Sequence, residues 1–270
     1  MSWVIFNVID ELTTTNKKQQ LRLAKAIANN DLVIVEKLLQ QGVNPNVSLV
    51  GLAGEPLIFL VFEKSWFTLP PEQLGDRPKR CYRITAKAEC LWLLLEHNVN
   101  PNVKDSLGRT VLEIAIIWCL PTVVKLLLLN GADPNSRDSK HQTPLMKAAI
   151  LGVQDARLMT DKLQIIKHLI DSGAEIDAQT PDGQTALMFA VGNSRLEIVE
   201  FLVSHGASLT VYDHQGNRAS DIINQSISHQ QQIYLRKILN QPQLNIAKYQ
   251  QFIPEGDRLL ASLINNLTNN

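Results

Sequence analysis

The stretch from Gly131 to Met146 reads GADPNSRDSKHQTPLM, and both of its ends recur along the chain. Segments related to its first five residues stand at 42–46, 98–102, 173–177 and 206–210. The steps from 98 to 131 and from 173 to 206 are equal, and each matches a repeat period of about 33 residues. The steps from 42 to 98 and from 131 to 173 are longer. A recurring period of this length predicts a fold built from stacked repeats.

The other end of the stretch keeps step with the first. Thr110, Thr143 and Thr185 stand at the same offset from the segments that begin at 98, 131 and 173. Because both ends lengthen together, the extra residues are insertions inside two repeats. We expect them between the first and second helix of each repeat, within about residues 64–85 and 152–160.

These residues resemble the ankyrin-repeat family, whose unit is about 33 residues long. The likeness lies in Thr143-Pro144-Leu145 followed by Ala148-Ala149, in Leu187 with Ala190, and in residues 198–202 followed by Gly206-Ala207. It covers roughly residues 20 to 240, most of the chain. The resemblance implies an all-α fold, a solenoid of helix–turn–helix units with projecting hairpin loops.

Elementary chemistry accounts for the recurring residues. A threonine at the start of a helix can accept a hydrogen bond from a free backbone N–H, and proline fits the first turn. Small side chains such as Ala148 and Ala149 let the first helices of neighbouring repeats pack closely. Gly131 and its equivalents would end the second helix in a left-handed conformation, and Asn98, which replaces glycine, also tolerates that conformation.

Three regions follow from this pattern. Residues 1–19 are an N-terminal extension, which forms either a lid on the first repeat or a helix that docks a partner. Residues 20–243 hold about six repeats, of which the first and the last are degenerate caps that face water. Residues 244–270 are a tail with a candidate short helix from Glu255 to Leu267.

Composition and motifs argue against several other classes of protein. The charges balance at 26 basic and 26 acidic residues, so the electrostatic drive for nucleic-acid binding is missing. No stretch is apolar for long enough to span a membrane, and we expect a cytoplasmic protein without membrane insertion. Neither the three cysteines nor the six histidines have metal-site spacing, and no phosphate loop or nucleophile motif is present. We therefore expect no cofactor, no metal, no catalytic residue and no enzymatic activity.

The resemblance also implies where a partner would bind. Ankyrin-family proteins generally use their hairpin tips and the exposed side of their first helices, which together form a concave face. One repeated position on those helices holds the apolar residues Phe59, Ile114 and Phe189, and two further positions hold Phe62 and Trp118. The tips hold Asp105, Leu107, Ser139, Lys140, Asp182 and His214. The apolar row is either an exposed binding surface or part of the core, and we favour the binding surface.

The insertion in the second repeat adds a further candidate. Its aromatic residues Trp66, Phe67 and Tyr82 would be unfavourable in water, so they are candidate contact residues. We predict a non-catalytic protein–protein interaction module, an adaptor, assembly factor or inhibitor. It would bind another protein through the concave face, this insertion or both, as a monomer by itself or as a subunit of a hetero-complex.

The alternative function uses the one basic cluster of the chain. Arg77, Lys79, Arg80 and Arg83 stand close together around Tyr82. They would bind nucleic acid or an anionic ligand, or they form a solvated loop face, since Glu72 and Asp76 are nearby.

Overall fold

The computed structural model describes residues 2–48, 55–62, 88–150, 156–223 and 229–240, and in 2–15, 156–157, 229–230 and 240 it describes the backbone alone. The chain divides into two compact units, Met1–Asp133 and Pro134–Asn270. Among the described residues, all the regular secondary-structure elements are α-helices or short 3-10 helices. The predicted all-α ankyrin-repeat fold is confirmed.

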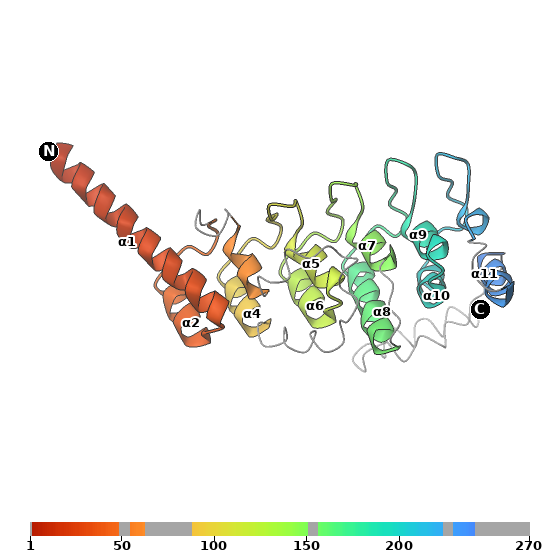
Figure 1. The fold of residues 1–270 in the computed structure, drawn as a ribbon, viewed down its shortest axis with the longest axis horizontal. Helices are drawn as coiled ribbons and strands as arrows, with labels where there is room; N and C mark the ends of the chain where they lie inside the picture. The colour runs from red at the N-terminus through yellow and green to blue at the C-terminus, as the bar shows by residue number, and fades with distance from the viewer. Residues whose placement is uncertain (1, 49–54, 63–87, 151–155, 224–228, 241–270) are drawn as a thin grey trace, which may run out of the picture. The chain divides into compact units, whose positions relative to one another are not determined.

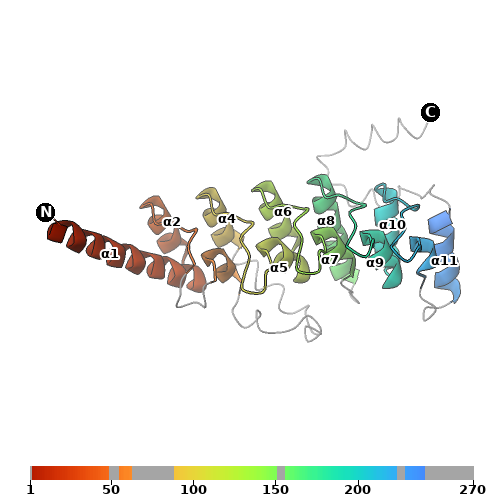
Figure 2. The same cartoon turned by 90° about the horizontal axis from the view of Figure 1, so that it is seen from above.

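The described part of the first unit contains three helix pairs. Helix α1 (Ser2–Asn29) packs on α2 (Leu32–Gln40), the 3-10 helix η2 (Leu57–Val61) packs on α4 (Ala88–Glu96), and α5 (Val111–Ile117) packs on α6 (Pro121–Leu129). Successive pairs are stacked, because α1 contacts η2, α2 contacts α4, and α4 contacts α6. Figures 1 and 2 both show α2, α4 and α6 side by side.

The second unit repeats this arrangement. Helix α7 (Pro144–Ile150) packs on α8 (Ala156–Asp171), α9 (Ala186–Gly192) packs on α10 (Leu196–Ser204), and the 3-10 turn η6 (Ala219–Asp221) packs on α11 (His229–Asn240). The stacking runs from α7 to α9 to η6. Ala148, Ala149 and Ala190 are fully buried, as expected where first helices approach closely.

Threonines begin the first helices α5, α7 and α9 as predicted. The hydroxyl of Thr185 accepts a hydrogen bond from the N–H of Met188 at 3.3 Å. Thr110 forms a complete capping box, in which its hydroxyl accepts from the N–H of Glu113 at 3.2 Å and its own N–H donates to the Glu113 carboxylate at 3.3 Å. These bonds satisfy N–H groups that have no partner within the helix.

The second helices end in left-handed residues, also as predicted. The N–H of Gly131, whose φ is +85°, donates to the carbonyl of Leu128, and the next N–H donates to the carbonyl of Leu127. Asn98 adopts φ +58°; its N–H donates to the carbonyl of Leu95, and the N–H of Val99 donates to the carbonyl of Leu94. The substitution of asparagine for glycine therefore preserves the helix end.

A ladder of amides joins neighbouring repeats within each unit. In the first unit Asn102 donates from Nδ2 to the carbonyl of Gly131 at 2.9 Å, and its Oδ1 accepts from the N–H of Asp133 at 2.8 Å. In the second unit Asn135 makes the equivalent bonds to Gly173 and Glu175 at 2.9 and 2.8 Å. The last residue of each of these two segments thus ties one helix end to the next.

Two elements are longer than a bare repeat requires. Helix α1 has 28 residues, so the expected boundary at residue 19 falls inside it. Helix α8 has 16 residues where α6 and α10 have 9, so residues 156–160 of the second insertion extend this helix. The expected tail at 244–270 and the insertion within 64–85 lie outside the described residues.

Candidate functional site

The hairpins that precede α5, α7, α9 and η6 share one backbone geometry. In the hairpin that begins at Asp138, the N–H of Asp138 donates to the carbonyl of Gln142 at 3.1 Å. Its Oδ1 accepts from the N–H groups of Lys140 and Gln142 at 2.8 and 2.7 Å. Asp105 and Asp213 accept the same two bonds in their own hairpins. The first residue therefore closes the loop, and the next two residues carry exposed side chains.

In the second unit these hairpins are bonded to one another. Nη1 of Arg137 donates to the carbonyl of Gln179 at 2.9 Å, and Nε2 of Gln179 donates to the carbonyl of Tyr212 at 3.1 Å. The N–H of His214 donates to the carbonyl of Asp182 at 2.9 Å. Three loops that are far apart in sequence thus form one supported surface, which we call the hairpin platform (residues 137–142, 179–184 and 212–218).

Two hairpins of the platform approach so closely that one position excludes a side chain. A Cβ on Gly183 would lie 2.9 Å from the Cα of Asp213 and 2.9 Å from the backbone nitrogen of His214. Gly183 also has φ +80°, which side chains rarely adopt. Glycine at this position allows the hydrogen bond between the two hairpins to form.

An ion pair fixes the base of the first platform hairpin. Nζ of Lys147, on α7, contacts Oδ2 of Asp138. Burial by itself would raise the pKa of Asp138, but the hydrogen bond and charge of Lys147, with the N–H groups of Gln142 and Lys140, hold this pKa below its ordinary value. In the third hairpin the N–H of Asn217 has the largest part in lowering the pKa of Asp213. Both carboxylates are ionised at neutral pH and stabilise their loops.

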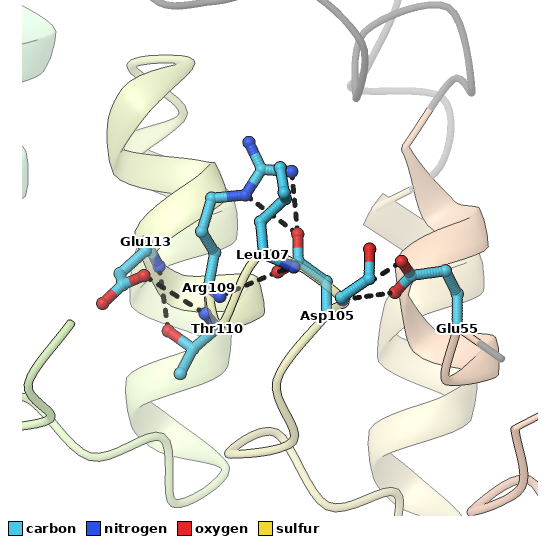
Figure 3. A network of polar contacts seen from close by, with 7 residues as sticks. Glu55, Asp105, Leu107, Arg109, Thr110 and Glu113 are labelled. Carbon is cyan, nitrogen blue, oxygen red and sulfur yellow. Dashed lines mark hydrogen bonds and ion pairs between the residues drawn. The ribbon is translucent and has the colours of Figure 1, made fainter. Parts of the chain in front are cut away.

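The hairpin of the first unit is tied down on both sides (Figure 3). The guanidinium of Arg109 contacts Oδ2 of Asp105 through Nε at 2.8 Å and Nη2 at 2.7 Å. The carboxylate of Glu55 accepts from the N–H of Ser106 at 3.1 and 3.2 Å. Leu107 at the tip is 62% exposed. This hairpin presents one apolar side chain on a fixed backbone.

The expectation of an exposed apolar row is wrong for four of its five members. Phe59 is 1% exposed and Trp118 is 7% exposed, and Phe62 and Ile114 are equally buried. All five residues of η2 are buried, as are the first six of α5. The repeat register of the sequence assigns each residue a position on a helix, but it does not say how deeply that position is buried. Burial of a large apolar side chain is favourable by about 1.5–3 kcal/mol, so the chain buries these residues. Phe189 on α9 is half-buried.

The predicted tip residues fall into two groups. Asp105 is buried, and its carboxylate forms an ion pair with Arg109. The prediction that Asp105 is exposed at the tip is therefore wrong, and the residue has a structural role. The other tip residues are exposed: Leu107, Ser139, Lys140, Asp182 and His214. Of these, the last four belong to the hairpin platform. The predicted contacts Trp66, Phe67 and Tyr82 and the basic cluster Arg77–Arg83 lie outside the described residues.

One exposed aromatic of the platform escaped the sequence reasoning. Tyr212 is 55% exposed, and the guanidinium carbon of Arg218 lies 5.9 Å from the centre of its ring. The sequence does contain a signal for Tyr212, which is its place in the repeat. Arg137, Gln179 and Tyr212 each directly precede the first residue of a hairpin. Side chains at this register position follow one edge of the platform.

Two kinds of feature are absent from the described part of the chain. Within it, no three His, Cys, Asp or Glu side chains are grouped so that they could hold a metal ion. No helix of that part is long and apolar enough to cross a membrane. The platform instead combines a lysine, a carboxylate, an imidazole and a tyrosine, which suits polar recognition.

Comparison with known proteins places this geometry in a family context. Residues 82–138 and 121–213 match the family model of ankyrin repeats. Human ankyrin repeat and SOCS box protein 6 is 30% identical over 132 residues, which cover 46% of this chain and 30% of that protein. A transient receptor potential cation channel subfamily A member 1 homolog of Caenorhabditis elegans is 24% identical over 226 residues, covering 80% of this chain and 18% of the relative.

A third relative is named for an enzymatic activity. Glycerophosphocholine phosphodiesterase gde1 of Schizosaccharomyces pombe is 35% identical over 104 residues, which cover 38% of this chain and 8% of that protein. The chain therefore spans less than a third of the length of each of these relatives. Ankyrin-repeat relatives are mostly non-enzymatic binding modules, and the repeats themselves generally mediate protein–protein interaction.

Proposed function

Because the chain belongs to the ankyrin-repeat family, we propose that it is a non-catalytic module that binds another protein through its hairpin platform. Lys140, Asp182 and His214 would make the first polar contacts, and Tyr212 would supply an aromatic anchor. An adaptor, an assembly factor and an inhibitor all use such a surface.

The observation that carries this proposal is the bonding of the three loops to one another. Loops that are free in solution lose conformational entropy when they bind, whereas a pre-organised surface loses less. The bonds from Arg137 to Gln179, and from His214 to Asp182, hold the tips in place before any partner arrives.

The chemistry of the exposed tips supports protein as the partner. A cation, an anion and an imidazole stand on three successive loops, so the platform carries no single sign of charge. Nucleic acid would favour a uniformly basic surface. A protein surface with complementary polar groups fits the mixed pattern, and electrostatic complementarity then sets specificity.

The test is a triple substitution, Lys140→Ala with Asp182→Ala and His214→Ala. Proteins that co-purify with the wild-type chain from its source should bind the variant at least tenfold more weakly, while its melting temperature stays within a few degrees. The matched control replaces three exposed polar residues of the same unit that lie off the platform, Ser172, Glu175 and Glu197, by alanine. Equal binding by both triple variants would refute the proposal.

A further inference from the structure

One position on the outward side of the second helices is exposed in the first unit and buried on α10. It lies six residues before the left-handed residue that ends each second helix. Its members along the chain are Glu36, Trp92, Lys125, Lys167 and Glu200. The first three are exposed and Lys167 is partly buried, whereas Glu200 is only 2% exposed. Trp92 is 46% exposed although α2 and α6 both pack beside its helix, so flanking helices alone do not cover this position.

Two neighbouring positions on α10 are also covered. Phe201 is 1% exposed, with its ring stacked on that of His205, whereas the equivalent Lys37 on α2 is exposed. Ser204 is partly buried, although its equivalents on the other four second helices are exposed. Glu197, one turn before Glu200 on the same side, is exposed. The cover therefore lies over the last two turns of α10 and not over the first.

A carboxylate buried on this side of α10 needs a polar partner as well as a cover. Loss of hydration is unfavourable for an ionised group unless a cation or hydrogen-bond donors compensate for it. The cation at the equivalent position of α8, Lys167, forms an ion pair with Asp171 at 2.6 Å. Glu200 is buried in one copy of the chain by itself, so the cover comes from the chain and not from a partner.

The part of the chain that follows α11 can reach this face. Within the second unit, residues 151–155, 224–228 and 241–270 lie outside the described residues, and the first two of these segments contain no lysine or arginine. Helix α11 packs on α10 and ends at Asn240, just before the Gln241-Pro242 pair that disfavours a further helical turn. With helix axes about 10 Å apart, roughly four extended residues beyond Asn240 reach α10.

We propose that residues 241–253 dock on the outward face of the last two turns of α10, and that Lys248 is the cation that pairs with Glu200. Lys248 is the one charged residue of 241–253, and its apolar neighbours Ile246 and Tyr249 are suited to cover Phe201. The other cation of the C-terminal segment, Arg258, stands beside Glu255 and Asp257, which compete for its charge.

The face of α10 is thus a docking site for a segment in which a lysine is flanked by apolar side chains, and the chain supplies that segment itself. The docked segment ties α11 to α10 and supports the last two repeats. This proposal depends on burial along α10 and not on the hairpin platform, so the two proposals can fail independently.

The direct test is a photo-cross-link within the full chain. A benzophenone amino acid in place of Tyr249 should react with α10, and mass spectrometry after proteolysis locates the product. Glu200→Lys should reduce the yield of this product by about fivefold or more, because two cations then face each other. The charge swap, Glu200→Lys with Lys248→Glu, should restore most of the yield.

The melting temperature provides an independent measure. Lys248→Gln should lower it by roughly 4 °C or more, because a buried carboxylate loses its cation. Glu200→Gln with Lys248→Gln should lose less than the sum of the two single variants, since both remove one interaction. As controls, Glu197→Gln on the exposed turn of α10 and Arg258→Gln should leave the melting temperature within about 2 °C and the cross-link unchanged.

Three results would overturn the proposal. The first is a product from position 249 that lacks α10 or that joins two copies of the chain. The second is an equal yield of the α10 product in the wild-type background and in Glu200→Lys. The third is a melting temperature that falls with Arg258→Gln and not with Lys248→Gln, since another part of the chain would then cover Glu200.

Discussion

Replacing Gly183 by alanine tests whether the platform hairpins depend on one another. Gly216 provides the matched comparison, because it occupies the same hairpin position with the same φ of +80°. A Cβ at Gly216 would meet nothing within 4 Å, whereas a Cβ at Gly183 would meet backbone atoms of Asp213 and His214 at 2.9 Å. The two substitutions therefore share the strain of the left-handed backbone and differ in the contact alone.

The magnitudes follow from these two terms. The left-handed conformation costs a side chain about 1–2 kcal/mol, and this applies to both variants. At Gly183 the hairpins must also separate, which adds overpacking strain of about 1–3 kcal/mol and loss of the His214-to-Asp182 bond, worth about 1 kcal/mol. Gly183→Ala should thus lose roughly 2–4 kcal/mol more of the free energy of unfolding than Gly216→Ala.

Urea unfolding of the two variants measures this difference, and amide exchange locates it. The His214 amide should lose protection in Gly183→Ala and keep it in Gly216→Ala. If the platform binds a partner, Gly183→Ala should also weaken that binding although it alters no exposed tip side chain. Equal losses of stability in the two variants, with equal protection of His214, would refute the reasoning.

Four further predictions concern stability. Ser194→Gly should raise the free energy of unfolding by roughly 0.5–1 kcal/mol in chemical denaturation, because Ser194 has φ +58° and glycine relieves that strain. Phe59→Ala should lower the free energy of unfolding by about 3–5 kcal/mol, since the ring is buried. A change below about 1 kcal/mol would contradict the burial of Phe59. Burial lowers the pKa of His205 below its ordinary 6.5, so the unfolded chain takes up a proton before the folded chain does. The contribution of His205 to the free energy of unfolding has its full value above about pH 6.5 and declines as the pH falls. His205→Gln should therefore lessen the drop in melting temperature between about pH 7 and pH 5. The lowered pKa of Asp138 acts in the same direction below about pH 4, and Lys147→Met should weaken that dependence.

The sequence predicted the fold because the repeat depends on local chemistry. A threonine cap such as Thr185 and a left-handed helix end such as Asn98 act within a few residues, so their pattern is visible in one dimension. The ladder role of Asn102 was not predicted, although its recurrence was visible. Its bonds reach residues 29 and 31 positions away, and only the stacked structure brings them together.

The candidate site was predicted less well because exposure depends on neighbours. Phe59 and Phe189 share one register position, yet Phe59 on the 3-10 helix η2 is 1% exposed and Phe189 on α9 is half-buried. Asp105 looked like a tip contact, but its carboxylate is used to close its own loop. The exposed residues Lys140, Asp182 and His214 lie one or two positions after such loop-closing residues, so the shared hairpin geometry would have separated them from Asp105.

Site-specific photo-cross-linking tests the central claim, that the hairpin platform holds a protein partner. A photo-reactive amino acid would replace Asp182 at a platform tip in one protein and Glu197 on α10 in another. Irradiation in extracts of the native source should join one protein to the chain from position 182 and none from position 197, and unlabelled wild-type chain should compete with this product. Cross-links from position 197 alone, or from position 182 to nucleic acid alone, would contradict the account.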